Sequence, residues 1–281
     1  MKDKKRIVFK VGTSTLTHVE TGGLDFVKIE KFVRILADFH NQGKDVIVVS
    51  SGAIAVGRKV LGLREKPTER SVKQACAAVG QIHLMSVYQK LFSEYQKSTA
   101  QILMTKVTIA NDTSRHNAQN TFRELLQMGI IPIVNENDTV ATDEFDLGDN
   151  DYLSAIVSAI AKADLLVLLS DIDGLYTDDP NNNPDARRIP YVERITDEML
   201  AMAKGPTTDL GTGGMSSKLG AAGIANDAGA DMAIINGNDM DNINRLFAGE
   251  DIGTMFKAHK TKHFHLKNYL EFGGNDGAVK N

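Results

Sequence analysis

The chain has 281 residues, of which 42% are hydrophobic and 24% are charged, as is ordinary for a globular protein. Its net charge of -4 gives no general reason to expect binding to nucleic acid, and no run of about 20 apolar residues is present to span a membrane. The N-terminal sequence has no apolar signal-peptide core, so a cytoplasmic protein is expected.

Short β-branched segments alternate with helical patterns from the N-terminus onward, which is typical of parallel strands joined by crossover helices. The segment RIVFKVG, residues 6–12, predicts the first strand, with a turn beginning at Gly12. From Asp25 to Gly43, apolar residues at helical spacing predict an amphipathic helix. Residues 45–53 are apolar on both faces of a strand, so we expect this strand near the centre of a sheet covered on both sides.

The remaining elements continue the same alternation. A long helix is expected from about Ser71 to Tyr95. The single cysteine of the chain, Cys76, lies in this helix among small residues, which is typical of a buried structural thiol. The other expected strands begin at about residues 101, 130, 164 and 231, and the other expected helices cover about 117–128 and 152–163. This order predicts an α/β fold, a three-layer α/β/α sandwich with a mainly parallel central sheet.

Breaks in the pattern predict the domain organisation. Residues 1–256 contain no repeat or low-complexity linker, so we expect them to form one domain. Residues 257–281 show no clear period and are expected to form a tail. His263 and His265 have the His-x-His spacing of metal ligands, but no acidic or cysteine partner is near them in the sequence, which favours a solvated tail.

Polar residues gather where the expected strands end, and ligands of open parallel sheets bind outside the carboxyl ends of the strands. These residues are Lys10, Gly12, Ser50, Ser51, Gly52, Asn135, Glu136, Asn137, Asp138, Ser170 and Asp171, with Asp149, Asn150 and Asp151 at the start of a helix. Taken singly, each fits a turn or a helix cap. Lys10 does not, because it interrupts a strand suited to burial and needs a negative partner there. Together they predict a binding edge.

The segment DLGTGGMSSKLGAAG, residues 209–223, has the composition of an anion-binding loop followed by a helix. Backbone N–H groups around Gly211, Gly213 and Gly214, the N-terminus of the helix and the ammonium group of Lys218 would all favour a phosphate. The spacing matches neither the Walker A motif nor the dinucleotide-binding fingerprint, so this segment alone is a weak signal.

Phosphoryl transfer accounts for both sets of residues. This chemistry needs cations on the transferred group and N–H groups around the phosphates, and Lys10 and Lys218 would be the cations. No histidine or isolated aspartate at the strand ends is an obvious base for a hydroxyl acceptor, whereas a carboxylate or phosphate acceptor is already ionised at neutral pH. The sequence therefore favours a kinase that acts on a carboxylate or on a phosphate.

Several segments resemble, in order, the glutamate 5-kinase branch of the amino acid kinase superfamily. They lie within residues 6 to about 256 and are FKVGTS, VVSSGAIAVG, AAVGQ, PIVNENDTVAT, GDNDYLSA, LLSDIDGLYTDDP and GTGGMSSKLGAA. NEND with GDND is specific to this branch, whereas the lysine strand and the TGGM loop are shared more widely. The resemblance implies phosphorylation of the γ-carboxylate of L-glutamate by ATP and Mg²⁺, the first step of proline biosynthesis.

The resemblance also implies roles for individual residues. Lys10 and Lys218 would stabilise the transferring phosphoryl group, and Asp151 would hold the two lysines in place. The residues expected to bind glutamate are Ser51, Asp138 and Asn150, with Asp138 suited by charge to the α-ammonium group. The residues expected to bind ATP are Lys10, Ser170, Asp171, Thr212, Gly213, Gly214, Met215, Ser216, Ser217 and Lys218, with residues 174–180 near the adenosine. Mg²⁺ would sit on phosphates and water, without named protein ligands.

The resemblance also implies partners, and the sequence leaves several other substrates open. Many members of the family carry a C-terminal PUA domain, for which this sequence is too short, and residues 257–281 are expected to be its vestige. Members are commonly oligomeric and inhibited by proline, so a homo-oligomer and proline are expected partners, and nucleic acid and membranes are not. The alternatives are kinases of N-acetylglutamate, aspartate or UMP and, from another class, a non-enzymatic amino-acid sensor. Both lysines and Asp151 argue against the sensor.

Overall fold

An eight-stranded sheet with the order β3-β4-β2-β1-β5-β9-β10-β8 organises the part of the chain that the structure describes. The computed structural model describes residues 1, 3–18, 21–141, 150–180, 182–203, 214–262 and 264–270. The strands of the sheet are β1 Arg6–Val11, β2 Asp45–Ser50, β3 Thr99–Met104, β4 Ile131–Glu136, β5 Leu165–Ser170, β8 Tyr191–Val192, β9 Asp231–Asn236 and β10 Thr254–Phe256. A separate antiparallel pair joins β6, Leu175–Tyr176, to β7, Arg188–Ile189.

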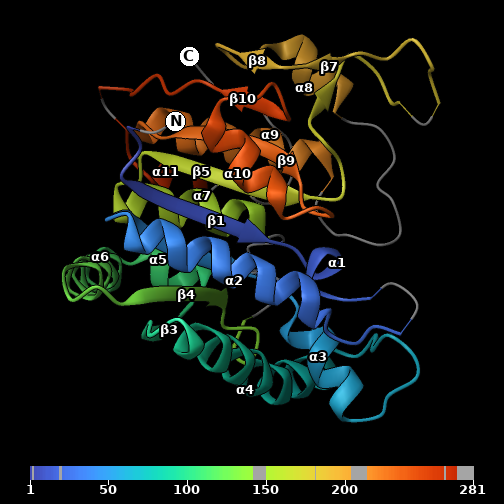
Figure 1. Ribbon diagram of the computed structural model, residues 1–281, viewed down its shortest axis with the longest axis vertical. Coiled ribbons are helices and arrows are strands. Elements are labelled where there is room, and N and C mark those ends of the chain that lie inside the picture. Colours follow the sequence, from blue (N-terminus) through green and yellow to red (C-terminus); the bar gives the residue numbers. More distant parts are fainter. Residues whose placement is uncertain are drawn as a thin grey trace.

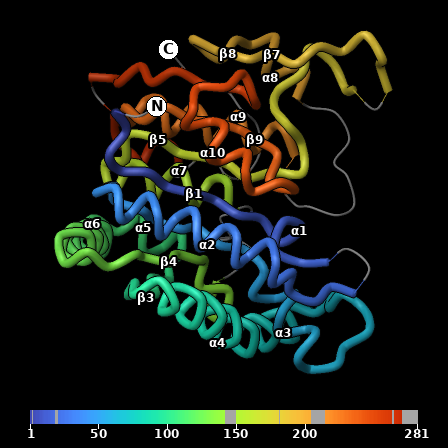
Figure 2. The backbone as a smooth tube through the Cα atoms, viewed as in Figure 1, coloured from blue at the N-terminus to red at the C-terminus, as the bar shows by residue number. Residues whose placement is uncertain are grey.

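Neighbouring strands of the sheet are parallel, except that β10 runs antiparallel to β9. The chain starts at the centre with β1, adds β2, β4 and β3 on one side, and then crosses to the other side with β5 and β9 (Figure 2). The direction of chain growth therefore reverses between β1 and β5. Such a reversal is where open parallel sheets bind their ligands.

Helices cover both faces of the sheet, which confirms the predicted three-layer α/β/α sandwich (Figure 1). Helices α2, α4 and α10 pack on one face, and α6, α7 and α9 pack on the other. The helices are α1 Thr13–Leu16, α2 Phe26–Asn41, α3 Ala53–Val60, α4 Arg70–Glu94, α5 Lys106–Ala110, α6 Asp112–Gln127, α7 Asn150–Ala161, α8 Asp197–Met202, α9 Met215–Ala228, α10 Asp241–Ala248 and α11 Lys267–Leu270. Among the described residues, none of the helices is both long enough and apolar enough to cross a bilayer.

Strand β1 shows how the sequence pattern sets the two layers. Ile7, Phe9 and Val11 belong to the hydrophobic cluster on the α2 side, whereas Val8 belongs to the cluster on the α7 side. Side chains alternate across a strand, so Lys10 must point to the same side as Val8. The central strand thus directs its lysine toward α7 and α9.

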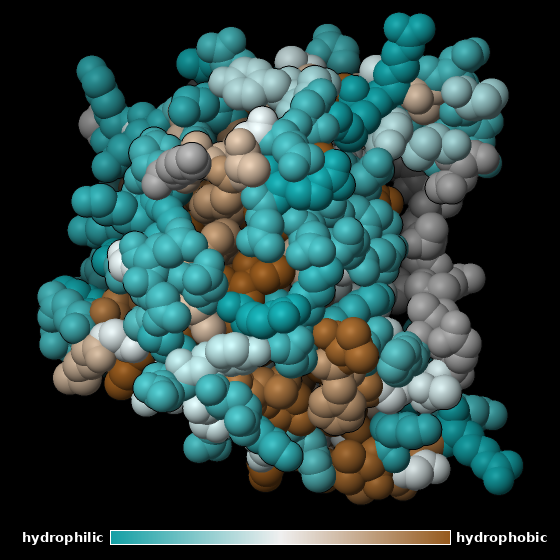
Figure 3. All heavy atoms as spheres, viewed as in Figure 1, coloured by the Kyte–Doolittle hydropathy of each residue, from teal (hydrophilic) through white to brown (hydrophobic). Residues whose placement is uncertain are grey.

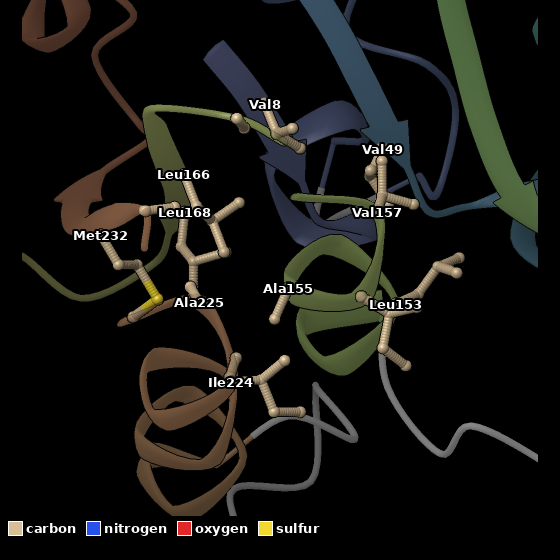
Figure 4. Packing of buried hydrophobic residues seen from close by; sticks show 14 of the residues in the cluster. Val8, Val49, Leu153, Ala155, Val157, Leu166, Leu168, Ile224, Ala225 and Met232 are labelled. Atoms are coloured by element: carbon tan, nitrogen blue, oxygen red, sulfur yellow. The ribbon is translucent and has the colours of Figure 1, made fainter. Parts of the chain in front are cut away.

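Small residues let α7 and α9 approach the sheet and each other. Ala155 of α7 and Ala225 of α9 lie beside Leu166 and Leu168 of β5 in the packed layer (Figure 4). A Cβ atom at Gly220 of α9 would overlap the ring of Tyr152 on α7. The prediction of a helix after the glycine-rich segment is confirmed, and this helix is tightly packed.

Helices α3 and α4 cross where each has a glycine. A Cβ at Gly57 would overlap the backbone carbonyl of Cys76, and one at Gly80 would overlap the carbonyl of Ala53. Helix α3 begins after Gly52, whose φ of +103 is a conformation that residues other than glycine rarely adopt. The end of β2 is therefore joined by one tight turn to a helix that is fixed against α4.

Most of the predicted elements are confirmed, with boundaries shifted by a few residues. Strand β4 continues to Glu136, so Asn135 and Glu136 lie inside the strand and do not follow it. The turn expected after Gly12 is the single turn of α1. Cys76 is buried and free, as predicted. Strands β6, β7, β8 and β10 were not predicted, because two or three residues are too few to show a period.

The described part of the expected tail lies against the domain. The backbone N–H groups of His259 and Thr261 donate to the carbonyls of Asn226 and Asp227 at 3.1 and 3.0 Å. Leu266 is buried, and α11 follows it. Residues 271–281 and His263 lie outside the described part of the chain.

Candidate active site

Two buried lysines share one buried carboxylate at the centre of the molecule. Nζ of Lys10 on β1 lies 2.6 Å from Oδ1 of Asp151, and Nζ of Lys218 on α9 lies 3.2 Å from Oδ2 of the same side chain. All three side chains are buried, with Asp151 at 0% exposure. The residues predicted as catalytic are thus brought together, and the negative partner that Lys10 requires is Asp151.

One carboxylate contacts two ammonium groups in this cluster. Burial opposes ionisation of Asp151, but the ammonium groups of Lys10 and Lys218 outweigh it and lower the pKa of the carboxyl group. Two ammonium groups at one buried site, where the dielectric is low, attract an anionic ligand such as a phosphate.

The N-terminus of α9 adds backbone donors next to Lys218. The helix starts at Met215 with Gly214 as its N-cap, and no side chain caps it. N–H groups in the first turn of a helix have no acceptor within the helix, so they are available to an anion. Ser217 donates to the carbonyl of Gly214 at 3.0 Å and lies 3.4 Å from Oδ2 of Asp151. Ser216 is exposed in the same turn, whereas Thr212, Gly213 and Gly211 lie outside the described residues.

The register of the sheet aligns the other predicted residues along its carboxyl edge. Val11 of β1 pairs with Ser50 of β2 on one side and with Leu169 of β5 on the other. Ser170 pairs with Asn236 of β9. The strand ends that carry the polar residues are therefore neighbours, as the sequence predicted.

Asn150 connects three of these elements. Its Nδ2 lies 2.8 Å from Oγ of Ser51, 3.1 Å from the carbonyl oxygen of Ser50 and 3.0 Å from Oδ1 of Asn135. Asn150 starts α7, and the next residue is Asp151. The predicted glutamate-binding pair of Ser51 and Asn150 is thus in direct contact and lies one residue from the lysine cluster.

Asp138 lies at the same edge, two residues after β4. It is half-buried in a turn in which the N–H groups of Val140 and Ala141 donate to the carbonyl of Asn137 at 3.1 and 3.0 Å. The neighbouring segment of residues 142–149, which includes Asp149, lies outside the described part of the chain.

The residues expected near the nucleotide lie on the β5 side of the edge. Ser170, the last residue of β5, is buried and donates to Oδ1 of Asp171 at 3.1 Å, and Asp171 is exposed. The carbonyl of Asp171 accepts from Nδ2 of Asn236 at 3.3 Å. Asp173 follows and accepts from the hydroxyl of Tyr176 at 2.9 Å. This side of the edge is polar and open, in contrast to the buried lysine cluster.

Helix α4 places two buried polar groups behind the strand ends, and the sequence did not predict the contact of either group. Oε1 of Gln81 accepts from Nδ2 of Asn135 at 2.9 Å, and the hydroxyl of Tyr88 lies 3.0 Å from Oγ of Ser50. Burial raises the pKa of Tyr88, which stays neutral. A glutamine on a helix face otherwise occupied by Cys76 and Leu84 was the available sequence signal.

The described residues contain no group of three His, Cys, Asp or Glu side chains arranged to hold a metal ion. The carboxylate of Asp151 is already engaged by two ammonium groups.

The sequence and the fold have known relatives. Residues 5–236 match the model of the amino acid kinase family. The chain is 51% identical over 279 residues to a glutamate 5-kinase of Carboxydothermus hydrogenoformans, covering 99% of this chain and 75% of the relative. It is 52% identical over 260 residues to a glutamate 5-kinase of Clostridium tetani, covering 92% of this chain and 97% of the relative.

Solved structures share the fold at much lower identity. Isopentenyl phosphate kinase of T. acidophilum has a TM-score of 0.63 at 17% identity and covers 90% of this chain and 100% of its own. Carbamate kinase of Giardia lamblia, bound to AMP-PNP, has a TM-score of 0.65 at 15% identity, with 92% and 100% covered. The fold and the close relatives agree, and the chain belongs to the glutamate 5-kinase branch of the amino acid kinase family.

Proposed function

We propose that the protein transfers the γ-phosphoryl group of ATP to the γ-carboxylate of L-glutamate and forms L-glutamyl 5-phosphate, the first step of proline biosynthesis. The observation that carries the proposal is the buried Lys10–Asp151–Lys218 cluster at the carboxyl edge of the sheet. About half of the residues are identical to those of proteins named glutamate 5-kinase, which supports glutamate as the acceptor.

In this proposal the two lysines stabilise the charge of the transferring group. A carboxylate oxygen of glutamate bonds to the γ-phosphorus as the bond from that phosphorus to the β–γ bridging oxygen breaks, and ADP leaves. Lys10 and Lys218 face this phosphoryl group, and Asp151 fixes their separation by binding one ammonium group with each oxygen. No base is required, because the acceptor is ionised at neutral pH.

Glutamate is proposed to lie over the Ser51–Asn150 pair, with its α-ammonium group at Asp138. This orientation would direct the γ-carboxylate toward Lys10 and the neighbouring phosphate. The first-turn N–H groups of α9, with Ser170 and Asp171, would border the nucleotide. Mg²⁺ would neutralise phosphate charge and orient the leaving group.

ADP release is the experiment that tests the function. The protein is supplied with Mg·ATP and, separately, with L-glutamate, N-acetylglutamate, L-aspartate and UMP, in the presence of hydroxylamine to trap an acyl phosphate. We expect turnover and a hydroxamate product with L-glutamate. Turnover with another acceptor alone would replace the proposed substrate, and the absence of turnover in folded protein that binds ATP would favour the amino-acid sensor.

We also propose that the protein forms a homo-oligomer and is inhibited by L-proline. Support for self-association comes from exposed apolar side chains of α3, α4 and the segment between them, namely Val60, Leu61, Leu63 and Ile82. Hydrophobic side chains gather in the lower part of the face in Figure 3, where Figure 1 places these helices. Light scattering with size-exclusion chromatography tests the proposed self-association. Glutamate turnover measured with added L-proline tests the proposed inhibition.

A further inference from the structure

We infer that Gln81 is a positioning residue that sets the orientation of the glutamate-binding amide of Asn150 through Asn135. The inference rests on the proposed function, since it concerns the glutamate side of that site. Gln81 lies one residue after the Gly80 crossing on α4, on the side that faces β4. It acts on Asn150 through a second side chain and has no proposed contact with substrate.

Three side-chain amides form an ordered chain. Nδ2 of Asn135 donates to Oε1 of Gln81 at 2.9 Å, and Oδ1 of Asn135 accepts from Nδ2 of Asn150 at 3.0 Å. Asn135 is 2% exposed and Gln81 is 8% exposed, so water does not compete freely for these bonds. The chain joins α4, β4 and α7.

Both the oxygen and the nitrogen of the Asn135 amide, the middle one of the three, are hydrogen-bonded. Oδ1 of Asn135 also accepts from the backbone N–H of Glu136 at 2.9 Å, so this oxygen receives two donors. A rotated Asn135 amide would place its NH₂ group against those donors and its oxygen against Oε1 of Gln81. Gln81 therefore stabilises the one orientation in which Asn135 offers an acceptor to Asn150.

The same logic orients Asn150. Its Nδ2 faces Oδ1 of Asn135, the carbonyl of Ser50 and Oγ of Ser51. Because two of these three groups can only accept, the NH₂ group must face this cluster, and the carbonyl oxygen of the planar amide points away from it. If Asn135 rotates, Asn150 loses one of its acceptors and its own orientation becomes less defined.

The buried amide of Gln81 is paired through its oxygen and not through its nitrogen. Nε2 of Gln81 is buried and has no hydrogen-bond partner among the described residues. Such a donor is a cost to folding, and an apolar side chain of the same length would remove it only by leaving Nδ2 of Asn135 without its acceptor. The acceptor of Gln81 is the part that contributes to the site, through Asn135.

The substitution Gln81→Met tests this role, because methionine has nearly the shape of glutamine but lacks the strong acceptor. We expect the KM for L-glutamate to rise about 10-fold, with the KM for ATP and kcat changed less than about threefold. The melting temperature should change little, since the variant removes one unpaired donor and creates another at Asn135. Equal increases of both KM values, or an unchanged KM for glutamate, would overturn the inference.

Tyr88→Phe is the matched control. Tyr88 is buried on the same helix and loses one hydrogen bond, to Ser50, and within the described part of the chain no hydrogen bond joins it to the three amides. We expect a lower melting temperature and an unchanged KM for glutamate. If Tyr88→Phe raised the KM as much as Gln81→Met, the effect would be a general loosening of α4 and the inference would be wrong.

A double-mutant cycle and a spectrum separate this inference from the proposed function. In an Asn135→Ala background, Gln81→Met should have no further effect on the KM, because the intermediate amide is gone. Side-chain NH₂ signals of Asn135 and Asn150 in ¹H–¹⁵N spectra of the ligand-free protein should shift in Gln81→Met and stay in place in Tyr88→Phe. If the wild type does not turn over glutamate, the proposed function is wrong but the positioning role is not refuted. If the Asn150 signals do not shift in Gln81→Met, the positioning role is wrong but the proposed function is not refuted.

Discussion

The ammonium group of Lys10 lies 2.6 Å from Oδ1 of Asp151, and both side chains are buried. The lysine comes from the central strand and the aspartate from the first turn of α7, so the ion pair connects the middle of the sheet to a helix on one face. A buried ion pair is weak evidence of stability, because removing two charges from water costs about as much as their attraction returns. Its position at the reversal point of the sheet indicates a functional role.

Asp151→Asn should strongly destabilise the protein, because the buried ammonium groups of Lys10 and Lys218 would lose the carboxylate that both contact. We expect a loss of about 3–5 kcal/mol of unfolding free energy, measured by denaturant titration. A non-hydrolysable ATP analogue with Mg²⁺ should reduce this deficit, since its phosphates would supply the missing negative charge. An equal deficit with and without the analogue would show that the phosphates do not reach the lysines.

Lys218→Ala should reduce kcat by about 10² to 10³, the effect typical of removing one donor that stabilises a transition state. Lys31→Ala is the control, because Lys31 also binds two carboxylates, those of Asp239 and Asp241, but on the surface. The measurement is steady-state ADP release with saturating glutamate and ATP. Activity within about threefold of the wild type would exclude Lys218 from the transferring group.

Asp138→Asn should raise the KM for L-glutamate by about 10- to 100-fold, because the variant keeps the shape of the turn but loses the charge opposite the α-ammonium group. The KM for ATP should not change. Thr139→Ala, at the next and exposed position of the same turn, controls for disturbance of the turn. A KM for glutamate that is the same in Asp138→Asn and the wild type would remove the proposed contact.

Asp231→Asn should lower stability by about 1–3 kcal/mol at neutral pH. Asp231 is buried, which opposes ionisation, but the ammonium group of Lys4 at 2.6 Å and the N–H of Ala258 at 2.8 Å outweigh burial and lower its pKa below 3.8. A carboxyl group with a lowered pKa stabilises the fold fully above its ordinary pKa, and this contribution is lost as the pH falls through the lower folded value. The difference between wild type and variant should therefore be constant down to about pH 4 and shrink below it. Unfolding free energies measured from pH 7 to pH 3 check this, and a difference that grows in acid would contradict it.

The sequence predicted the residues whose identity conflicts with their local pattern. Lys10 stands in a strand of Ile7, Val8, Phe9 and Val11, so its need for a buried anion is visible without a structure. The resemblance to a known family then supplied Asp151 as the partner, and the geometry agrees. Glycines and Asx residues at strand ends were likewise visible, because open parallel sheets place these ends together.

The sequence did not predict partners that depend on how a helix packs on the sheet. Gln81 on α4 meets Asn135 because the strand register and the approach of α4 to β4 bring them together, and neither is encoded in local spacing. The short strands β8 and β10 were missed for a similar reason. They are strands because they pair with neighbouring strands, and their own few residues show no strand pattern. Local sequence patterns therefore predicted the helices and strands of the layers. The hydrogen-bonded amides of Gln81, Asn135 and Asn150 depend on long-range packing, which these patterns do not contain.

The glycine crossing of α3 and α4 limits how this protein can be made more heat-resistant. Replacing a helical glycine with alanine usually stabilises a protein, because it restricts the unfolded chain. At Gly57 and Gly80 the added methyl group would instead force the two helices apart, since the facing backbone occupies its space. Helix α3 starts two residues after Ser51, and Gln81 follows Gly80 directly. Alanine at Gly57 or Gly80 would therefore disturb the glutamate side of the site first, because the lysine cluster lies on the opposite face of the sheet.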